Sequence, residues 1–315
     1  MDFSEQKYTL IEIDSLLNDR ITDFNLYIIN EDNYVLFRSS DLPFTEKHKQ
    51  NLLNKKLKIY IDSRDYAKYL EYIKKNLTNL KYNGDMSLEI KNKYFYDSSK
   101  ILINNVFEKP DDEDLKNSIQ TLADTAGDLL KDNDYDLRNI LKVIEFEYST
   151  LTHSLNLSLL ISNFARLAGY DETDLPVLIK GALLHDVGKS RIDKSILLKP
   201  GKLDKTEWDE MKKHPLYGKN ILKNHNISDK IIADSVLYHH EKIDGSGYPF
   251  NLKSEEIPFE AQLISICDVF DALTTRRCYK NALGSFPAFK IMLYEMEGSF
   301  NNELLQIFVN MFKTN

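Results

Sequence analysis

Gly181-Ala-Leu-Leu-His185-Asp186-Val-Gly188-Lys189 is the stretch around which the larger half of this chain is organised. Its apolar residues read as the last turn of a buried helix that delivers a His-Asp pair. Adjacent helical side chains point about 100° apart, but at a helix end two long ones still reach a single cation. Bare carbonyls there carry partial negative charge and favour a cation. Gly188 is expected to stop the helix in a left-handed conformation, with Lys189 one step beyond.

A His-Asp dipeptide alone is a weak signal, but five of the chain's seven histidines belong to one set of candidate metal ligands in this half of the sequence. One aspartate, Asp268, lies among apolar helical residues, where a buried carboxylate is costly unless it is paired or bound to metal. Imidazole and carboxylate together suit iron, manganese or zinc, and the lack of thiolate partners argues against a closed structural zinc site. The candidate metal ligands are His153, His185, Asp186, His214, His239, His240 and Asp268.

Helical periodicity runs through this half from about residue 137. One helix is expected to stop at Gly169, and Asp174 opens the helix that ends at the His-Asp pair. Thr206 with Asp209 resembles a capping box for a short helix. No strand signal of comparable strength appears, so this half is predicted to be an all-α domain.

Two further features favour an anionic ligand. Gly245 and Gly247 punctuate the loop after the histidine pair, where they allow positive φ and close approach of the backbone to a ligand. A plain turn is the alternative for that loop. Arg277 and Lys280 follow the Asp268 helix, and at that place phosphate binding is favoured over a merely solvated surface.

The first part of the chain differs in pattern. Residues 24–29 and 34–37 predict a β-hairpin, 57–61 another strand and 64–80 a helix, which makes a small α+β unit without a catalytic signature. Two helices then run to about residue 130. The polar segment 131–136 is the expected boundary, so we predict an N-terminal domain over 1–132, with a helical linker at about 85–132, and a second domain over 133–315.

Composition narrows the class of protein. The 315-residue chain has a net charge of −8, which argues against a general nucleic-acid binder. No apolar run approaches the ~20 residues that a membrane span needs, and no secretory signal is seen. Two cysteines, Cys267 and Cys278, form no disulfide framework. We therefore expect a cytoplasmic protein.

Three stretches together resemble the HD-GYP branch of the HD phosphohydrolase superfamily. They are His185-Asp-Val-Gly-Lys189, Tyr238-His-His-Glu-Lys-Ile-Asp-Gly-Ser-Gly-Tyr-Pro249 and Asp268-Val-Phe-Asp-Ala-Leu273. The segments 199–203 and 211–215 also look like that branch. The resemblance covers roughly residues 140–290 and leaves the N-terminal unit outside.

The resemblance implies a helical bundle that hydrolyses cyclic di-GMP, to pGpG or on to GMP, with two divalent ions, iron first and manganese as the alternative. By position, one ion would take His153, His185, Asp186 and Asp268. The second would share Asp186 and take His214, His239 and His240. Two cations bridged by a carboxylate lower the pKa of a bridging water, and the resulting hydroxide would attack phosphorus.

The same resemblance suggests further roles. Asp186 and Lys189 would be catalytic, and the substrate would meet Lys189, Gly247, Tyr248, Pro249, Arg277 and Lys280. The Gly-Tyr-Pro loop is associated in this family with docking of diguanylate cyclase (GGDEF) domains. Ser149 stands where members with a third metal carry a Glu, so two ions are expected. Asp271, one turn after Asp268, is expected to support a ligand or the loop from behind.

Alternatives remain open at this point. A metal-bearing sensor would bind the dinucleotide without hydrolysing it, and another HD phosphohydrolase would act on a different nucleotide. The N-terminal domain is expected to regulate the enzyme, and a homodimer through the helices between 111 and 150 is a further hypothesis.

Overall fold

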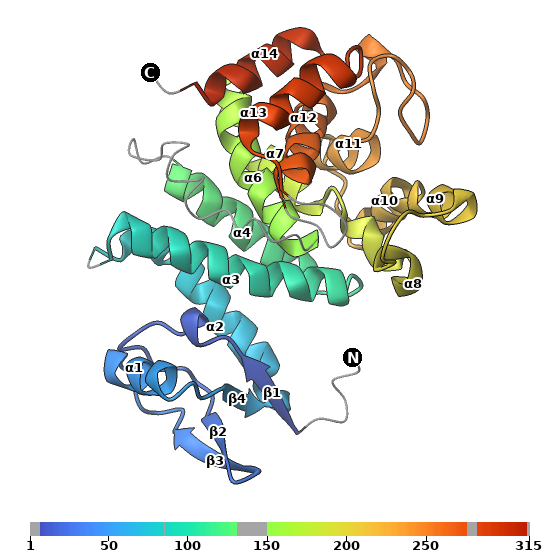
Figure 1. The fold of residues 1–315 in the computed structure, drawn as a ribbon. Coiled ribbons are helices and arrows are strands. Elements are labelled where there is room, and N and C mark those ends of the chain that lie inside the picture. The colour runs from blue at the N-terminus through green and yellow to red at the C-terminus, as the bar shows by residue number, and fades with distance from the viewer. Residues whose placement is uncertain (1–6, 85, 131–149, 276–281, 314–315) are drawn as a thin grey trace. The chain divides into compact units, whose positions relative to one another are not determined.

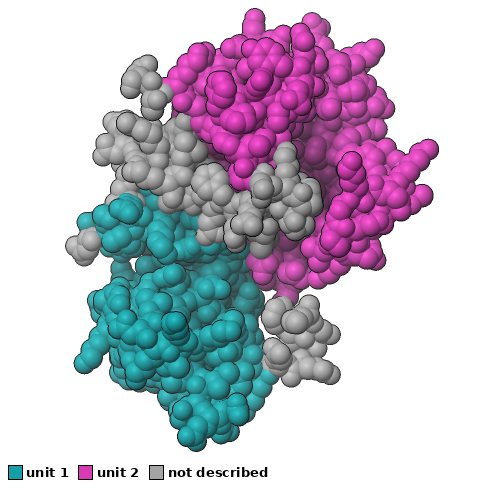
Figure 2. Space-filling view, in the orientation of Figure 1, with its two compact units in different colours: residues 1–101 teal, residues 102–315 magenta. Residues whose placement is uncertain are grey.

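The computed structural model describes residues 7–84, 86–130, 150–275 and 282–313 (Figure 1). The chain folds as two compact units, residues 1–101 and 102–315, which Figure 2 shows in different colours. The predicted domain boundary at 132/133 falls in the segment 131–149, outside the described ranges, and stays a prediction.

The first unit is the predicted α+β unit. Its elements are β1 (Tyr8–Ile11), β2 (Leu26–Asn30), β3 (Asn33–Arg38), α1 (Glu46–Asn54), β4 (Ile59–Asp62), α2 (Tyr66–Thr78) and the first part of α3 (Leu88–Glu108). The four strands form an antiparallel sheet in the order β1-β4-β2-β3, and β2 and β3 are the predicted hairpin.

Alternation along the strands decides which sheet face is covered. Ile59 and Ile61 of β4 are fully buried, whereas Tyr60 between them is half-buried. On α2, Tyr69 and Ile73 are buried one turn apart, and the Tyr69 hydroxyl lies 2.6 Å from that of Ser15. This unit therefore has a core of its own.

The described residues of the second unit are mostly helical, as predicted. Its elements are the end of α3, α4 (Leu115–Leu130), α6 (Thr150–Leu167), α7 (Leu175–Leu184), η4 (Val187–Arg191), α8 (Lys194–Leu197), α9 (Lys205–Met211), α10 (His214–Asn224), α11 (Lys230–Tyr238), α12 (Phe259–Thr274), α13 (Ser285–Lys290) and α14 (Asn302–Met311). Helix α7 packs against α4, α6 and α11, and α6 packs against α12 (Figure 1).

Helices α6, α7 and α12 form the centre of this unit. Leu157, Ile161 and Phe164 of α6 are fully buried, as are Leu178 and Leu184 of α7. A helix that is apolar nearly all round must lie inside the protein rather than on its surface. The ends and inner faces of these central helices therefore hold polar side chains away from water.

Of two predicted helix ends, the stop at Gly169 is confirmed and the start of α9 is not. Gly169 has φ +77° just after α6, as expected for a helix stop. The capping box of α9 was misplaced: Asp204, and not Thr206, is the N-cap, and its carboxylate accepts from the amide N–H of Glu207. The Glu207 side chain accepts from the Asp204 N–H in return, because glutamate is long enough to reach back over one turn. No helix within the described ranges is both long and apolar enough to cross a bilayer.

Candidate metal centre

The structure brings all seven predicted ligands together in two groups. Within each group, the donor atoms all lie within 4.8 Å of one another. Each group draws on helices that are distant in sequence. His153 lies in α6 and Asp268 in α12. The remaining five stand at helix ends, where the chain turns toward the centre of the unit: His185 and Asp186 follow α7, His214 begins α10, and His239 and His240 follow α11.

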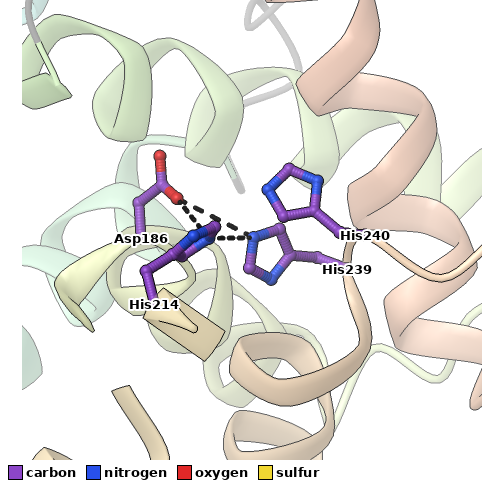
Figure 3. A group of neighbouring side chains, drawn as sticks. All are labelled: Asp186, His214, His239 and His240. Carbon is purple, nitrogen blue, oxygen red and sulfur yellow. Dashed lines mark hydrogen bonds and ion pairs between the residues drawn. The ribbon is translucent and has the colours of Figure 1, made fainter. Parts of the chain in front are cut away.

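The first group contains His153, His185 and Asp268. The Nε2 atoms of His153 and His185 are 3.2 Å apart, and Oδ1 of Asp268 lies 3.1 Å from His153 Nε2. The second group, shown in Figure 3, contains Asp186, His214, His239 and His240. There the Nε2 atoms of His214 and His239 are 3.3 Å apart. Nitrogen ligands about 2.1 Å from one divalent ion stand roughly 3.0–3.5 Å apart, so both spacings suit a shared ion.

Asp186 lies between the two groups and presents one carboxylate oxygen to each. Its Oδ1 is 3.2 Å from His214 Nε2 and 3.7 Å from His239 Nε2. Its Oδ2 is 3.4 Å from His185 Nε2 and 3.8 Å from His153 Nε2. A carboxylate in this position could bridge two ions.

Hydrogen bonds on the far side of each ring fix the tautomer of four histidines. The Nδ1 atoms of His185, His214 and His239 lie 2.7, 2.8 and 3.0 Å from the carbonyl oxygens of Ala182, Met211 and Val236, and Nδ1 of His153 lies 2.7 Å from Asp271 Oδ2. Those oxygens can only accept, so each Nδ1 carries the proton. With the proton on Nδ1, the Nε2 atom of each of these four rings is the one that faces the cluster and can bind a metal ion.

Burial and charge favour the metal-binding protonation states of His239, His240, Asp186 and Asp268. Burial lowers the pKa of His239 to about 4 and that of His240 well below its usual value. Burial opposes ionisation of Asp186 and Asp268. Lys189 and nearby histidines outweigh it at Asp186, and His153, His240 and His185 outweigh it at Asp268, so both carboxyl pKa values lie well below normal. Neutral imidazoles and ionised carboxylates are what a divalent cation requires.

The residues present fit such an ion. Oδ1 of Asp186 is fully buried and has no hydrogen-bond partner among the described residues, a costly state for a carboxylate oxygen that a cation would relieve. All donors are nitrogen or oxygen, which suits iron, manganese or zinc at a reactive site. Cys267, beside Asp268, is buried, and burial raises the pKa of its thiol. It packs as a small apolar side chain.

Gly188 plays a different part from the predicted left-handed stop. It lies inside η4, and its φ is not positive. A Cβ placed on it would meet the His214 carbonyl oxygen at 1.9 Å and the Gly218 nitrogen at 2.5 Å. The missing side chain therefore lets α10 approach η4 closely enough for His214 to face Asp186.

Lys189 completes the polar side of the cluster. Its Nζ donates to Oδ2 of Asp186, and its side chain is 16% exposed. The positive charge thus stands at the surface end of a buried carboxylate, beside the position that the first ion would occupy.

The loop after the histidine pair folds back on itself. Glu241, only 2% exposed, accepts hydrogen bonds from the amide N–H groups of Phe250 at 2.7 Å and Leu252 at 3.0 Å. Gly245 has the expected positive φ of +81°. At Gly247 a Cβ would lie 2.4 Å from the Lys242 nitrogen, so this glycine makes room for the loop's own backbone.

Gly247, Tyr248 and Pro249 line a cavity of about 550 Å³ that His240 also lines. The cavity therefore adjoins the metal cluster, where the side chain of His240 is 23% exposed. Burial raises the pKa of the Tyr248 phenol, which stays neutral. Arg277, Lys280, Cys278 and Ser149 lie outside the described residues.

Sequence patterns did not single out Asn156 or Glu241. Asn156 donates to Asp271 Oδ1 at 3.0 Å and so holds the carboxylate that orients His153. Asp271 was expected to support a ligand or the loop from behind, and it contacts His153, a predicted ligand. Glu241 directly follows the histidine pair in an otherwise polar loop, and only the fold reveals that it is buried.

Comparison with known proteins gives concordant results. A family model described as HD domain matches residues 137–304. The chain is 39% identical over 166 residues to 3'3'-cGAMP-specific phosphodiesterase 2 of Vibrio cholerae, which covers 52% of this chain and 31% of that protein. It is 36% identical over 173 residues to a cyclic di-GMP phosphodiesterase of Thermotoga maritima. This match covers 53% of this chain and 47% of that protein.

Among solved structures, the fold is similar to that of Bd1817, a HDG"Y"P protein from Bdellovibrio bacteriovorus. The TM-score is 0.70 at 23% sequence identity, and the match covers 98% of this chain and 100% of that one. At this identity the likeness concerns the fold. The chain spans a third to a half of the length of the two curated relatives named above.

Proposed function

This chain belongs to the HD domain family, and on that premise we propose that it is a metal-dependent phosphodiesterase that hydrolyses cyclic di-GMP. The observation that carries the proposal is the position of Asp186, with one oxygen toward each of two histidine groups whose Nε2 lone pairs converge. The relatives named as cyclic di-GMP and cGAMP phosphodiesterases support the same reaction class.

We assign one ion to His153, His185, Asp186 and Asp268, and a second to Asp186, His214, His239 and His240. Iron is the first choice and manganese the alternative, because both accept mixed imidazole and carboxylate ligands. Bound there, two divalent cations would activate water and neutralise the charge that builds on the phosphoryl oxygens. The protein holds the donors rigidly, since four rings are fixed by hydrogen bonds on their far side.

Lys189 is proposed to contact the scissile phosphate. Its ammonium group stands at the partly exposed edge of the cluster, so it would bind an equatorial oxygen and stabilise the charge of the transition state. Gly247, Tyr248 and Pro249 would form one wall for the substrate, because they line the cavity beside His240. Arg277 and Lys280 are proposed to bind the phosphates.

The wider assignments rest on the resemblance alone. We propose that the N-terminal unit regulates the activity and that the Gly-Tyr-Pro loop is also the docking site for diguanylate cyclase (GGDEF) domains. A homodimer through the helices between 111 and 150 is a further proposal.

The decisive experiment is turnover of cyclic di-GMP by the full chain, purified anaerobically and loaded with iron or manganese. Linear pGpG or GMP is expected, with Asp186→Asn inactive. Asp229→Asn is the matched control, because Asp229 caps α11 and asparagine caps equally well. Parallel assays with 3'3'-cGAMP define the substrate preference. Binding of cyclic di-GMP without any linear product at every metal loading would show a sensor instead.

A further inference from the structure

The cavity beside His240 has a second wall that the metal-centred reaction does not use. Helix α9 contributes Trp208 and Asp209, Lys212 directly follows this helix, and the loop residues Tyr248 and Pro249 line the same cavity. A volume of about 550 Å³ is that of a small-molecule site. The cavity thus extends from the cluster toward a helix outside the metal ligands.

Aromatic rings run from the cluster into this cavity. The Tyr248 ring lies 4.6 Å from that of His240, with 30° between their planes, and the Trp208 ring meets Tyr248 edge to face at 6.1 Å. Trp208 is 46% exposed, although indole is among the larger apolar groups. An exposed indole face beside a phosphate-binding centre is suited to stacking a nucleobase.

Charge in the cavity is arranged for a nucleotide. Lys212, Lys213 and Lys242 line it, and Asp209 is the one acidic residue among the described residues of the lining. Lys212 Nζ lies 2.7 Å from Oδ1 of Asp209, and its hydrogen bond holds the pKa of Asp209 below the usual range. The carboxylate is therefore ionised and can only accept hydrogen bonds.

An acceptor-only group distinguishes the two purines. Guanine presents two donors side by side, N1–H and N2–H₂, to a carboxylate. Adenine presents an acceptor at N1 next to its N6–H₂ donor, so one of the two contacts becomes repulsive. A carboxylate next to a stacking surface therefore favours guanine.

We propose that this cavity is a guanine subsite, in which Trp208 stacks on the base and Asp209 reads its N1–H and N2–H₂ edge. The inference rests on the proposed function, because it places a base of the cyclic dinucleotide whose phosphate lies at the metal cluster. Trp208 and Asp209 are thus specificity-determining residues that touch no reacting atom. Lys242, beside His240 in the lining, faces the negative charge of the dinucleotide.

The test uses the fact that Trp208 is the chain's single tryptophan. The full chain, stripped of metal by EDTA so that nothing is hydrolysed, is titrated with cyclic di-GMP and with cyclic di-AMP while tryptophan fluorescence is recorded. Cyclic di-GMP is expected to quench the fluorescence saturably and to bind about ten-fold or more tightly than cyclic di-AMP. Asp209→Asn should abolish or reverse that preference, because an asparagine side chain pairs with adenine.

Asp32→Asn is the matched control, since Asp32 lies in the exposed β2–β3 turn at φ +65°, which asparagine tolerates. It should retain the full preference for cyclic di-GMP. Trp208→Phe should remove the signal and raise KM of the metal-loaded enzyme.

The outcomes separate the two proposals. Hydrolysis of cyclic di-GMP without any change in Trp208 fluorescence at saturating ligand would overturn the subsite and leave the proposed function standing. An unchanged guanine preference in Asp209→Asn would also overturn it. A saturable, guanine-selective quench with no hydrolysis at any metal loading would support the subsite and overturn the phosphodiesterase.

Discussion

His153 donates its Nδ1 proton to Oδ2 of Asp271 across 2.7 Å, and the two residues are 118 positions apart in the sequence. Both side chains are buried, on α6 and α12. The other oxygen of Asp271 accepts from Asn156, one turn along α6 from His153. This pair of contacts locks two central helices together and fixes which nitrogen of His153 faces the cluster.

Asp271→Ala should therefore weaken metal binding without removing a ligand. We expect the affinity of the first ion to fall about 10- to 100-fold, the usual effect of losing a carboxylate behind a metal-binding histidine. The metal-free protein should also lose about 1–3 kcal/mol of stability, because His153 and Asn156 keep buried donors without acceptors. Competition with a chelator and urea unfolding measure the two effects.

Asp271→Asn retains one acceptor, so its metal affinity and its free energy of unfolding should lie between those of wild type and Asp271→Ala. Asp229→Asn, the same chemical change at an exposed cap, should match wild type in both measurements. Equal metal affinity in all four proteins would contradict the role given to Asp271.

Gly188→Ala tests the close approach of α10 to η4. A methyl group there would overlap the His214 carbonyl oxygen and the Gly218 amide, both backbone atoms that cannot rotate away. We expect a loss of about 1–3 kcal/mol or more in the free energy of unfolding. The metal content should fall as well, because α10 carries His214.

Gly127→Ala is the control for this substitution. Gly127 lies in α4, and a Cβ added there meets nothing within 4 Å. Alanine should be neutral or stabilise this helix by about 0.5–1 kcal/mol. If both alanine variants unfold at the same urea concentration as wild type, the packing argument for Gly188 fails.

Much of the cluster was predictable because metal ligands are recognisable by residue type. The resemblance to the HD-GYP family is confirmed by the HD domain match over residues 137–304 and by the fold shared with Bd1817. The two-part fold class is confirmed as well. The grouping of ligands came from that resemblance, and the distances around Asp186 agree with it. Their metal-binding roles stay predictions.

What the sequence did not reveal depends on contacts between distant segments. Gly188 packs against a helix that begins 26 residues later, and no local pattern distinguishes such a glycine from a helix stop. Asn156 and Glu241 are polar residues whose importance follows only from burial. The start of α9 was misplaced because both Thr206 and Asp204 fit a capping pattern, and the longer partner, Glu207, decided between them.

Lys189→Met should separate metal binding from turnover. Lys189 touches Asp186 but is not among the nitrogen and oxygen donors of the cluster, so the variant should keep the wild-type metal content. Loss of one preorganised donor to the transition state usually costs 10²- to 10³-fold in kcat, and we expect roughly that reduction. Lys202→Met, at an exposed position after α8, is the control. A Lys189→Met protein with wild-type kcat would remove Lys189 from the mechanism.

Glu241→Ala should loosen the loop that carries Gly247, Tyr248 and Pro249. Both oxygens of Glu241 accept backbone N–H groups, from Phe250 and Leu252, and hydrogen bonds to a charged group contribute about 1.5–3 kcal/mol each. Alanine leaves both donors unpaired, whereas glutamine keeps one acceptor. We expect KM for cyclic di-GMP to rise in the order wild type, Glu241→Gln, Glu241→Ala.

Metal content should distinguish a loose loop from a damaged cluster. His239 is anchored through its own Nδ1 to Val236, so Glu241→Ala should retain both ions while limited proteolysis cuts the loop more readily. Glu255→Ala, an exposed acidic residue between this loop and α12, should change none of these properties. The opposite result would be loss of metal from Glu241→Ala while the loop stays as resistant to proteolysis as in wild type. The two hydrogen bonds to Phe250 and Leu252 would then be dispensable for the loop, and Glu241 would support the histidine pair instead.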